Sequence, residues 1–409
     1  DGKEIAAKKI FDKWDLDFAI IGKTTDTNNL TLKFNNKIIG EIPIEALASK
    51  APIYERKWVR KKTQKNKIDL KDLKKIKIEE AFIKILSSPN HSNKSWVTNQ
   101  YDQMVMCNTA QKSGSDAAII RIHNKDKAIA VTVDSSANYC ESHPLTGGKQ
   151  IVSENWRNLI TVGAKPLAIT NCLNFGNPEN KEIMGEFAEC LEGIKEACEF
   201  LNYPVVSGNV SFYNGTNKKN IYPTPVIGGV GLIKKLSKPI SHNFKRKKSH
   251  IILIGKTFGH LEQSCFLKEN YSIIEGMPPE INLLNEKNNG ECLLKLIDKN
   301  LILSAHDISS GGLITALSEM SMNSQYGAKI FKPKKLTNLF EYFFGEDQAR
   351  YIVEIDTNNL PKVKKIFKDG NIYFEEIGIT QEDQFEIEGE FNISIKELFE
   401  INNEWYNNF

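Results

Sequence analysis

One internal repeat limits the possible folds more than any other feature of the sequence. Lys9-Ile10-Phe11 recurs as Lys365-Ile366-Phe367, and Ile21-Gly22 recurs as Ile377-Gly378, so positions 10 and 22 return at 366 and 378. Self-similarity over so long a period indicates a duplicated unit. Each copy continues into an alternating apolar pattern and a closing helical pattern, which are Leu30-Thr31-Leu32 with Ile44–Leu47 in one and Phe385-Glu386-Ile387 with Ile395–Leu398 in the other.

A duplication assigns a place to the first 50 residues. They would be the tail of a first unit, most of which lies upstream. The chain begins Asp1-Gly2-Lys3 with an amphipathic pattern already under way by Ile10, which looks like a cut through a larger protein. The alternative is that the two copies are unrelated helix–strand–strand pieces of common composition.

Composition excludes several classes of protein. The 409 residues are 40% hydrophobic and 26% charged, which is typical of globular material. Lys+Arg number 54 and Asp+Glu 51, a balance that argues against nucleic acid as the main partner. No apolar run approaches the length of a membrane span, so no membrane partner is expected. The seven cysteines are odd in number and form no Cys-x-x-Cys pair, which predicts reduced thiols and a cytoplasmic location.

The chain divides at two basic stretches. Residues 51–80 are charge-rich with few large apolar groups and are interpreted as a solvated linker. Lys245-Arg246-Lys247-Lys248 marks a second boundary between two apolar-rich blocks. The blocks at 81–240 and 248–409 both alternate strand and helix patterns, which predicts α/β or α+β architecture.

Local patterns in the first block predict five elements. Ala128–Val133 is a strand, and Gly147-Gly148 opens a helix that reaches Ile160. The remaining elements are a strand over Leu167–Thr170, a helix opened by Pro178 that ends near Leu201, and a short buried strand from Pro204 to Gly208.

Three turns carry glycines and small polar groups where backbone N–H groups could bind an anion. Asp134–Gly148 could equally be ordinary capping, and Ser207–Ser211 could be a structural Gly-Asn turn. In His306–Gly312, Asp307 or Ser309 could simply cap the following helix. There is no Walker lysine, zinc set or nucleophile elbow. The histidines without a recognisable partner pattern are His91, His123, His242, His250 and His260.

Several longer runs, in one order along the chain, resemble the formylglycinamidine ribonucleotide synthases. The similarity is to the C-terminal half of the synthetase subunit and covers essentially the whole chain. The most diagnostic runs are Arg157–Leu159, Gly163–Thr170 and Leu173–Pro178. The resemblance continues in order through Val206–Ser211, Pro223–Gly229, Ser304–Ser309 with Gly311-Gly312-Leu313, and Phe344–Gln348.

The resemblance implies a fold and a reaction. The fold is a tandem of N-lobe and C-lobe units of the aminoimidazole ribonucleotide synthetase type, in which the N-lobes pair into a barrel. This chain would hold the tail of the first C-lobe (1–50), the linker (51–80), the second N-lobe (81–240) and the second C-lobe (248–409). The reaction is de novo purine synthesis: ATP phosphorylates the formamide oxygen of formylglycinamide ribonucleotide, and ammonia from glutamine displaces phosphate from this iminophosphate.

The resemblance also implies site residues and partners. Asn171 and Gly208 would contact ATP, Asn209 would bind Mg²⁺, and Ser211 would contact the substrate. The catalytic histidine and most metal carboxylates belong to the first half, so no catalytic residue is expected here and the chain alone should be inactive. Its partners would be the missing N-terminal half, a glutaminase subunit and a small accessory subunit.

Four positions depart from the family pattern. Asn171 and His143 stand where Asp is expected, Asn138 replaces Arg, and Ser310 replaces Asp. The last three lie in turns near the second half's own nucleotide pocket, so nucleotide binding there is left open. Two other functions stay as alternatives: a non-catalytic nucleotide-binding scaffold, and a ligase like aminoimidazole ribonucleotide synthetase.

Overall fold

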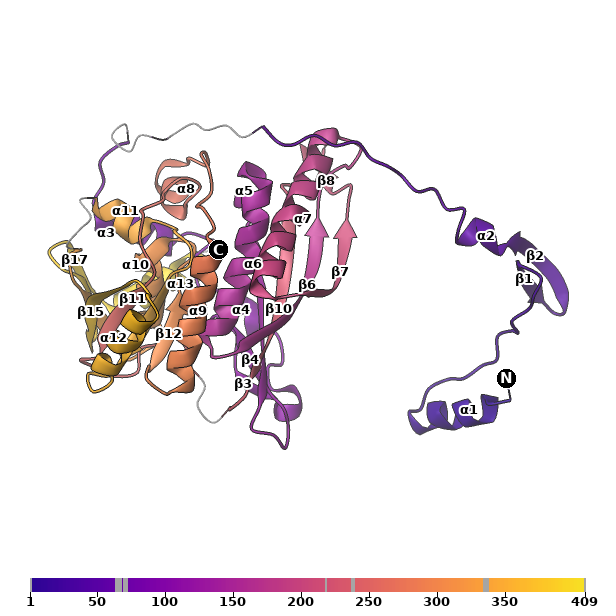
Figure 1. Cartoon of the computed structure of the whole chain (residues 1–409), viewed down its shortest axis with the longest axis horizontal. Coiled ribbons are helices and arrows are strands. Elements are labelled where there is room, and N and C mark those ends of the chain that lie inside the picture. Colours follow the sequence, from indigo (N-terminus) through magenta and orange to yellow (C-terminus); the bar gives the residue numbers. More distant parts are fainter. Residues whose placement is uncertain are drawn as a thin grey trace. The chain divides into compact units, whose positions relative to one another are not determined.

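The computed structural model describes residues 2–62, 68, 73–217, 219–236, 240–333 and 338–407. Contacts divide the chain into two units, Asp1–Glu55 and Arg56–Phe409, which are considered separately (Figure 1). The predicted linker at 51–80 lies partly outside the described residues, at 63–67 and 69–72. In the part of the chain that is described, no helix is both long enough and apolar enough to cross a membrane.

The smaller unit holds α1 (Glu4–Lys13), the antiparallel pair β1 (Asn29–Phe34) and β2 (Lys37–Pro43), and α2 (Ile44–Leu47). Neither helix buries a residue, and Ile5, Ile10 and Trp14 are 77%, 61% and 66% exposed. An amphipathic helix without a buried face lacks the packing that normally stabilises it. The apolar side chains of this unit are therefore largely exposed.

The second copy of the repeat has the same order of elements within the larger unit. It comprises α12 (Leu360–Asp369), β15 (Phe374–Glu382), β16 (Gln384–Ile387), β17 (Phe391–Ser394) and α13 (Ile395–Asn407). In the smaller unit the residues equivalent to β15 form no strand. Since β15 is hydrogen-bonded between β11 (His250–Ile254) and β13 (Tyr326–Ile330), it needs neighbours on both sides.

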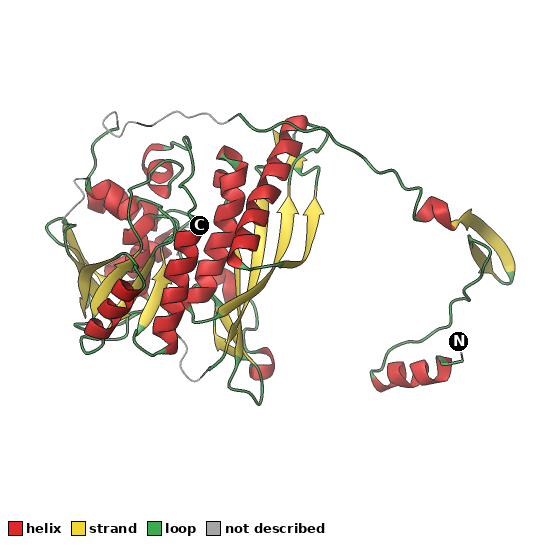
Figure 2. Ribbon diagram, in the orientation of Figure 1, coloured by secondary structure: helices red, strands yellow, loops and turns green. Residues whose placement is uncertain are grey.

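Arg56–Phe409 contains two large sheets (Figures 1 and 2). The six-stranded sheet has the order β3-β4-β5-β10-β6-β7 and is antiparallel except for the parallel pair β6–β7. Two long helices, α6 and α7, pack side by side along it. The elements of this lobe are β3 (Thr109–Gln111), β4 (Ala118–Arg121), β5 (Ala128–Asp134), α5 (Ala137–Ser142), α6 (Pro144–Thr161), β6 (Lys165–Asn174), α7 (Lys181–Leu201), β7 (Val205–Ser211), β8 (Gly215–Thr216), β9 (Lys219–Asn220) and β10 (Thr224–Ile233).

The seven-stranded sheet has the order β12-β14-β11-β15-β13-β16-β17. Ile251–Ile254 of β11 are all buried, because side chains on both faces of this central strand are covered. Its other elements are α8 (Cys265–Tyr271), α9 (Leu283–Asp298), β12 (Ser304–Asp307), α10 (Gly312–Met322), α11 (Leu339–Phe344) and β14 (Tyr351–Ile355), while α3 (Ile78–Leu86), α4 (Ser95–Thr98) and the 3₁₀ turn η2 (Val105–Cys107) precede both sheets.

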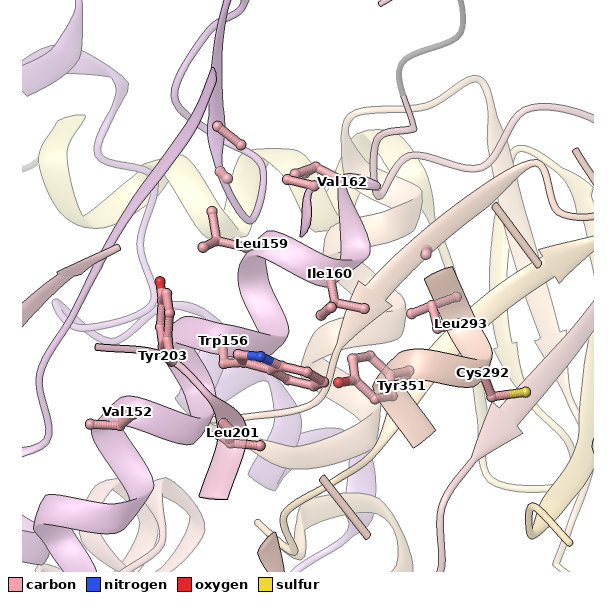
Figure 3. Packing of buried hydrophobic residues seen from close by; sticks show 14 of the residues in the cluster. Val152, Trp156, Leu159, Ile160, Val162, Leu201, Tyr203, Cys292, Leu293 and Tyr351 are labelled. Carbon is pink, nitrogen blue, oxygen red and sulfur yellow. The ribbon is translucent and has the colours of Figure 1, made fainter. Parts of the chain in front are cut away.

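One hydrophobic core runs through both lobes. Trp156 and Ile160 on α6 belong to the same buried cluster as Leu293 on α9 and Tyr351 on β14 (Figure 3). A Cβ atom on Gly290 would lie 2.2 Å from Trp156 Cζ3, so the indole packs directly onto the glycine of α9. This shared core fixes α6 against the seven-stranded lobe. A second cluster fills the opposite face of the seven-stranded sheet, beneath α3, α10 and α13.

The strand over 128–133 is confirmed as β5, but several predicted boundaries are wrong. The helix predicted to open at Gly147-Gly148 begins at Pro144, and these glycines lie inside it. A Cβ on Gly148 would lie 2.3 Å from the Cys190 carbonyl oxygen, so this glycine permits close packing of α6 on α7. The next helix begins at Lys181, capped by Asn180, and not at Pro178.

The strand predicted to be buried from Pro204 to Gly208 is exposed and longer, reaching Ser211. β7 is exposed because it is the edge strand of the six-stranded sheet. The sheet face opposite α6 and α7 is also open. Ile120, Ile129, Val133 and Val230 lie on it and are 39%, 36%, 66% and 38% exposed, so the face is apolar and uncovered in the described unit.

Candidate functional site

The parallel pairing of β6 and β7 brings two of the predicted nucleotide contacts together. Asn171 lies opposite Gly208 in the register. A Cβ atom on Gly208 would lie 2.0 Å from Asn171 Oδ1 and 2.7 Å from the Asn171 carbonyl oxygen. The Asn171 side chain therefore lies over the space that a larger residue at 208 would fill. Asn171 stands within β6 and does not follow its end, since this strand continues to Asn174.

Asn209 and Ser211 lie on the opposite face of the sheet from Asn171, because side chains alternate along a strand. They share the open face with Thr170, whose hydroxyl lies 3.0 Å from the Ser207 hydroxyl. The expected Gly-Asn turn is wrong, since Ser207–Ser211 is strand throughout. We refer to Asn171, Gly208, Asn209 and Ser211 as the β6–β7 edge.

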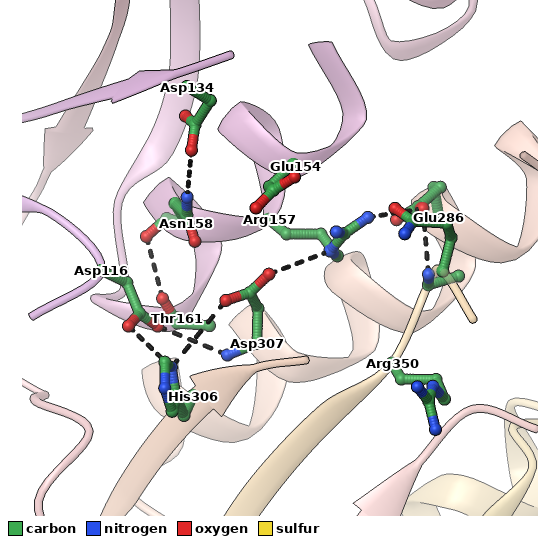
Figure 4. Close-up of polar contacts among 12 residues, drawn as sticks. Asp116, Asp134, Glu154, Arg157, Asn158, Thr161, Glu286, His306, Asp307 and Arg350 are labelled. Atoms are coloured by element: carbon green, nitrogen blue, oxygen red, sulfur yellow. Dashed lines mark hydrogen bonds and ion pairs between the residues drawn. The ribbon is translucent and has the colours of Figure 1, made fainter. Parts of the chain in front are cut away.

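A second polar group lies between the two lobes (Figure 4). Arg157, on α6, is fully buried and donates to Glu286 Oε1 on α9 at 2.8 Å and to Asp307 Oδ2 on β12 at 3.3 Å. A buried guanidinium needs such partners to offset its desolvation. Arg157 therefore links the lobes through one charged centre.

More buried carboxylates surround Arg157. Asp134, at the end of β5, accepts hydrogen bonds from Asn155 at 2.7 Å and Asn158 at 2.8 Å. Burial raises the pKa of Asp134 well above its ordinary value, and the carboxylate of Glu154 raises this pKa further. Burial also raises the pKa of Asp307 to about 7, against the opposing effect of Arg157.

Asp134, Glu154, Arg157, Glu286 and Asp307 form what we call the interlobe cluster. Its four carboxylates outnumber its one permanent cation. The excess negative charge can be relieved by uptake of protons or by a hard divalent cation, which carboxylate and amide oxygens suit. The sequence analysis singled out Asp134 and Asp307 as turn residues and missed Glu154 and Arg157, although polar residues on an otherwise buried helix were a usable signal.

The backbone N–H group at the start of α10 binds a carboxylate of the same chain, that of Glu346. Gly311 N donates to Glu346 Oε1 at 2.8 Å, and Cys265 N donates to the same oxygen at 2.8 Å. Tyr139 Oη donates to Glu346 Oε2 at 2.6 Å. The capping alternative for His306–Gly312 is wrong, since neither Asp307 nor Ser309 caps α10; its N-cap is Gly311, at φ 80°.

Of the departures from the family pattern near the second nucleotide pocket, His143 has a local structural role. The described contacts reveal none for Asn138 or Ser310. His143 is the N-cap of α6, and its Nδ1 accepts a hydrogen bond from Thr146 N at 3.2 Å. Burial lowers the pKa of His143, which favours the neutral ring that this cap requires. Asn138 lies in α5, and Ser310 lies in the turn before Gly311.

His306 does have close partners and lies beside His242, which the sequence did not reveal. His306 Nδ1 lies 2.7 Å from Asp116 Oδ1, and its Nε2 lies 3.0 Å from Glu319 Oε2. The two imidazole rings lie with their centroids 5.0 Å apart and their planes tilted by 33°. Asp116, His242 and His306 come from distant parts of the chain, so no local spacing in the sequence predicted that they lie close together.

Comparison with known proteins identifies both lobes. Residues 114–233 match the AIR synthase related protein N-terminal domain, and residues 250–389 match the AIR synthase related protein C-terminal domain. The chain is 51% identical to the phosphoribosylformylglycinamidine synthase subunit PurL of Pelagibacter ubique and 42% identical to that of Bradyrhizobium diazoefficiens. These matches cover 100% and 97% of this chain but only 56% and 54% of the two relatives, so the chain spans about half their length.

Solved structures share the fold. A T. maritima PurL complexed with FGAR matches with a TM-score of 0.63 at 16% identity, over 78% of this chain and 53% of that one. AaThiL complexed with AMPPCP and TMP matches with a TM-score of 0.51 at 18% identity, over 71% of this chain and 91% of that one. With its N-terminal and C-terminal domains in tandem, the chain belongs to the AIR synthase related family and is a homologue of part of the phosphoribosylformylglycinamidine synthase subunit PurL.

Proposed function

We propose that this chain is the second half of an ATP-dependent carbon–nitrogen ligase that makes formylglycinamidine ribonucleotide in purine biosynthesis, in the cytoplasm. ATP would phosphorylate the formamide oxygen of formylglycinamide ribonucleotide, and ammonia would displace the phosphate. The observation that carries the proposal is the juxtaposition of Asn171 and Gly208 in a homologue of PurL. Phosphoryl transfer depends on positioning and on charge stabilisation, for which amides and backbone groups are suited.

Within this proposal Asn171 and Gly208 contact ATP, and Ser211 contacts the ribonucleotide. Asn209 supplies an amide oxygen to Mg²⁺, which prefers hard oxygen ligands. The other β6 and β7 side chains on this face, which are Thr170, Cys172, Asn174, Ser207 and Ser211, include no carboxylate. The remaining ligands would therefore be carboxylates of the missing half and phosphate oxygens of an ATP that reaches from Asn171 to Asn209 around the edge strand β7. Bound Mg²⁺ would neutralise charge on the transferred phosphoryl group.

The missing N-terminal half is the first partner. We propose that its N-lobe packs on the open apolar face of the six-stranded sheet, where Ile120, Ile129, Val133 and Val230 are exposed. Residues 1–50 would complete its C-lobe, residues 51–80 would be the linker, and 81–240 and 248–409 would be the second N-lobe and C-lobe. A glutaminase subunit and a small accessory subunit would deliver ammonia; a Thermotoga maritima PurLQS complex has this fold.

A non-catalytic role for this half's own nucleotide pocket remains the second candidate. It is favoured by Glu346, whose carboxylate takes the backbone donors at the start of α10 that a phosphate would use. In both candidates the catalytic histidine and most metal carboxylates belong to the other half. The chain alone would then turn over no substrate.

Reconstitution tests the proposal. Purified 1–409 is assayed for phosphate release that depends on ATP, ammonium and formylglycinamide ribonucleotide, alone and mixed with the N-terminal half of a relative. We expect no turnover alone and turnover in the mixture, with a Gly208→Ala chain as the impaired control. Turnover by 1–409 alone, or a folded mixture that stays inactive, refutes this division of the enzyme.

A further inference from the structure

Three side chains from separate segments meet in a buried pocket. Asp116 precedes β4, His242 lies between the two lobes, and His306 is on β12. One ligand atom from each lies within 4.8 Å of the other two. The Asp116, His242 and His306 side chains are only 3%, 7% and 11% exposed. Figure 4 shows Asp116 and His306 close together. Among the described residues, this is the one such group of His, Cys, Asp or Glu.

His242 makes this pocket unusual. Both of its ring nitrogens are buried and neither has a hydrogen-bond partner. Its Nδ1 points toward Asp116 Oδ1, at 3.6 Å, which is too long for a hydrogen bond. A buried polar group without a hydrogen-bond partner destabilises the fold. An unmet nitrogen facing a carboxylate and a second imidazole is the arrangement that a metal ion would satisfy.

The outer contacts are those of a metal ligand. His306 Nδ1 lies 2.7 Å from Asp116 Oδ1, within ion-pair distance, while Nε2 lies 3.0 Å from Glu319 Oε2. A histidine that binds a metal with one nitrogen commonly donates the other N–H to a carboxylate, which fixes the tautomer. The second oxygen of Asp116 accepts from Asp307 N at 3.4 Å, so both ligands are oriented from outside.

We propose that Asp116, His242 and His306 bind a divalent transition metal of the Zn²⁺ class. Two imidazoles and one carboxylate form a donor set that suits Zn²⁺ and its neighbours and is poor for Mg²⁺. Asp307 Oδ1, 3.8 Å from His306 Nδ1, or a water supplies a fourth ligand. Each ligand comes from a different segment, so the ion ties the six-stranded lobe, the connection at 240–242 and the seven-stranded lobe together. Its role is structural and independent of the β6–β7 edge.

A competing arrangement leaves the pocket without metal. Asp116 and Glu319 both face His306, and their charges hold the pKa of this imidazole well above its ordinary value despite burial. A protonated His306 could pair with both carboxylates. This arrangement still leaves His242 without a partner, and it predicts no response of the protein to transition metals.

Cobalt binding separates the two arrangements. Untagged 1–409 is stripped with a chelator and titrated with Co²⁺, a coloured substitute for Zn²⁺. We expect stoichiometric binding with ligand-field bands in the visible spectrum. We also expect the melting temperature to rise by about 3–5 °C at Co²⁺ or Zn²⁺ concentrations about 100-fold above Kd. Mg²⁺ should have neither effect.

Variants assign the ligands. His242→Ala should abolish the bands, and His123→Ala, at an exposed histidine, should keep them. Glu319→Gln should weaken Co²⁺ binding by roughly 10-fold while the bands remain. If unaltered 1–409 shows no bands and no thermal shift, or if folded His242→Ala binds Co²⁺ unchanged, the metal site is refuted. Neither readout requires enzymatic activity, so the result stands apart from the proposed function.

Discussion

Replacing Arg157 with methionine tests whether the interlobe cluster holds the two lobes together. Methionine keeps much of the apolar stem and removes the charge. In the unaltered protein Arg157 donates to Glu286 Oε1 at 2.8 Å and to Asp307 Oδ2 at 3.3 Å. The substitution leaves both carboxylates buried without their cation. Breaking a buried ion pair from one side costs about 3–5 kcal/mol, and we expect this loss in the free energy of unfolding near pH 8.

The loss should depend on pH with a definite sign. The folded-state pKa of Asp307 is already raised to about 7, above its ordinary value of 3.8, so folding favours the protonated acid. The free energy of unfolding therefore falls as the pH rises from 3.8 to about 7. Without Arg157 the folded-state pKa values of Asp307 and Glu286 rise further. Each pH unit of this further rise lowers the free energy of unfolding by about 1.4 kcal/mol once both carboxyls are ionised. The variant should therefore lose least stability at pH 5 and most at pH 8.

Urea unfolding at pH 5, 6.5 and 8 measures this effect. Arg60→Met is the matched control, since Arg60 pairs with Glu189 and Glu192 but its side chain is 58% exposed. The control should lose at most about 1 kcal/mol. A loss below 1 kcal/mol for Arg157→Met at pH 8, or an equal loss at all three pH values, would refute the electrostatic account of the cluster.

Three further predictions concern the six-stranded lobe. Gly148→Ala should lower the free energy of unfolding by about 1–3 kcal/mol in urea, since the new Cβ would lie 2.3 Å from the Cys190 carbonyl oxygen; unchanged stability would contradict the close packing of α6 on α7. In the reconstituted enzyme, Asn171→Asp should change ATP affinity by at most about 1–1.5 kcal/mol, and Asn171→Leu should weaken it more. If the Michaelis constant for ATP stays constant and only the melting temperature falls, Asn171 is structural. Asn209→Ala should raise the Mg²⁺ requirement more than it lowers stability, and an unchanged Mg²⁺ titration would leave Asn209 without a metal role.

Local chemistry was sufficient to predict much of the architecture. β5 was found because Ala128–Val133 is a β-rich apolar run, and α6 and α7 were found because their apolar residues recur at helical spacing. The predicted starts of both helices were wrong, because Gly147-Gly148 and Pro178 were interpreted as helix start signals. The true start signals were the caps at His143 and Asn180, whose side chains accept hydrogen bonds from backbone N–H groups.

The sequence alone also determined the family, through long ordered motifs, and the α/β class, through periodicity. Only the tertiary structure decided which polar residues meet. Arg157 reaches carboxylates 129 and 150 residues away, and neither separation leaves a periodic signal in the sequence. The same holds for β7, which looked buried from its valines but lies at the edge of its sheet. Burial and charge pairing depend on which segments become neighbours in space, and that is set by the packing of whole sheets and helices, not by local spacing.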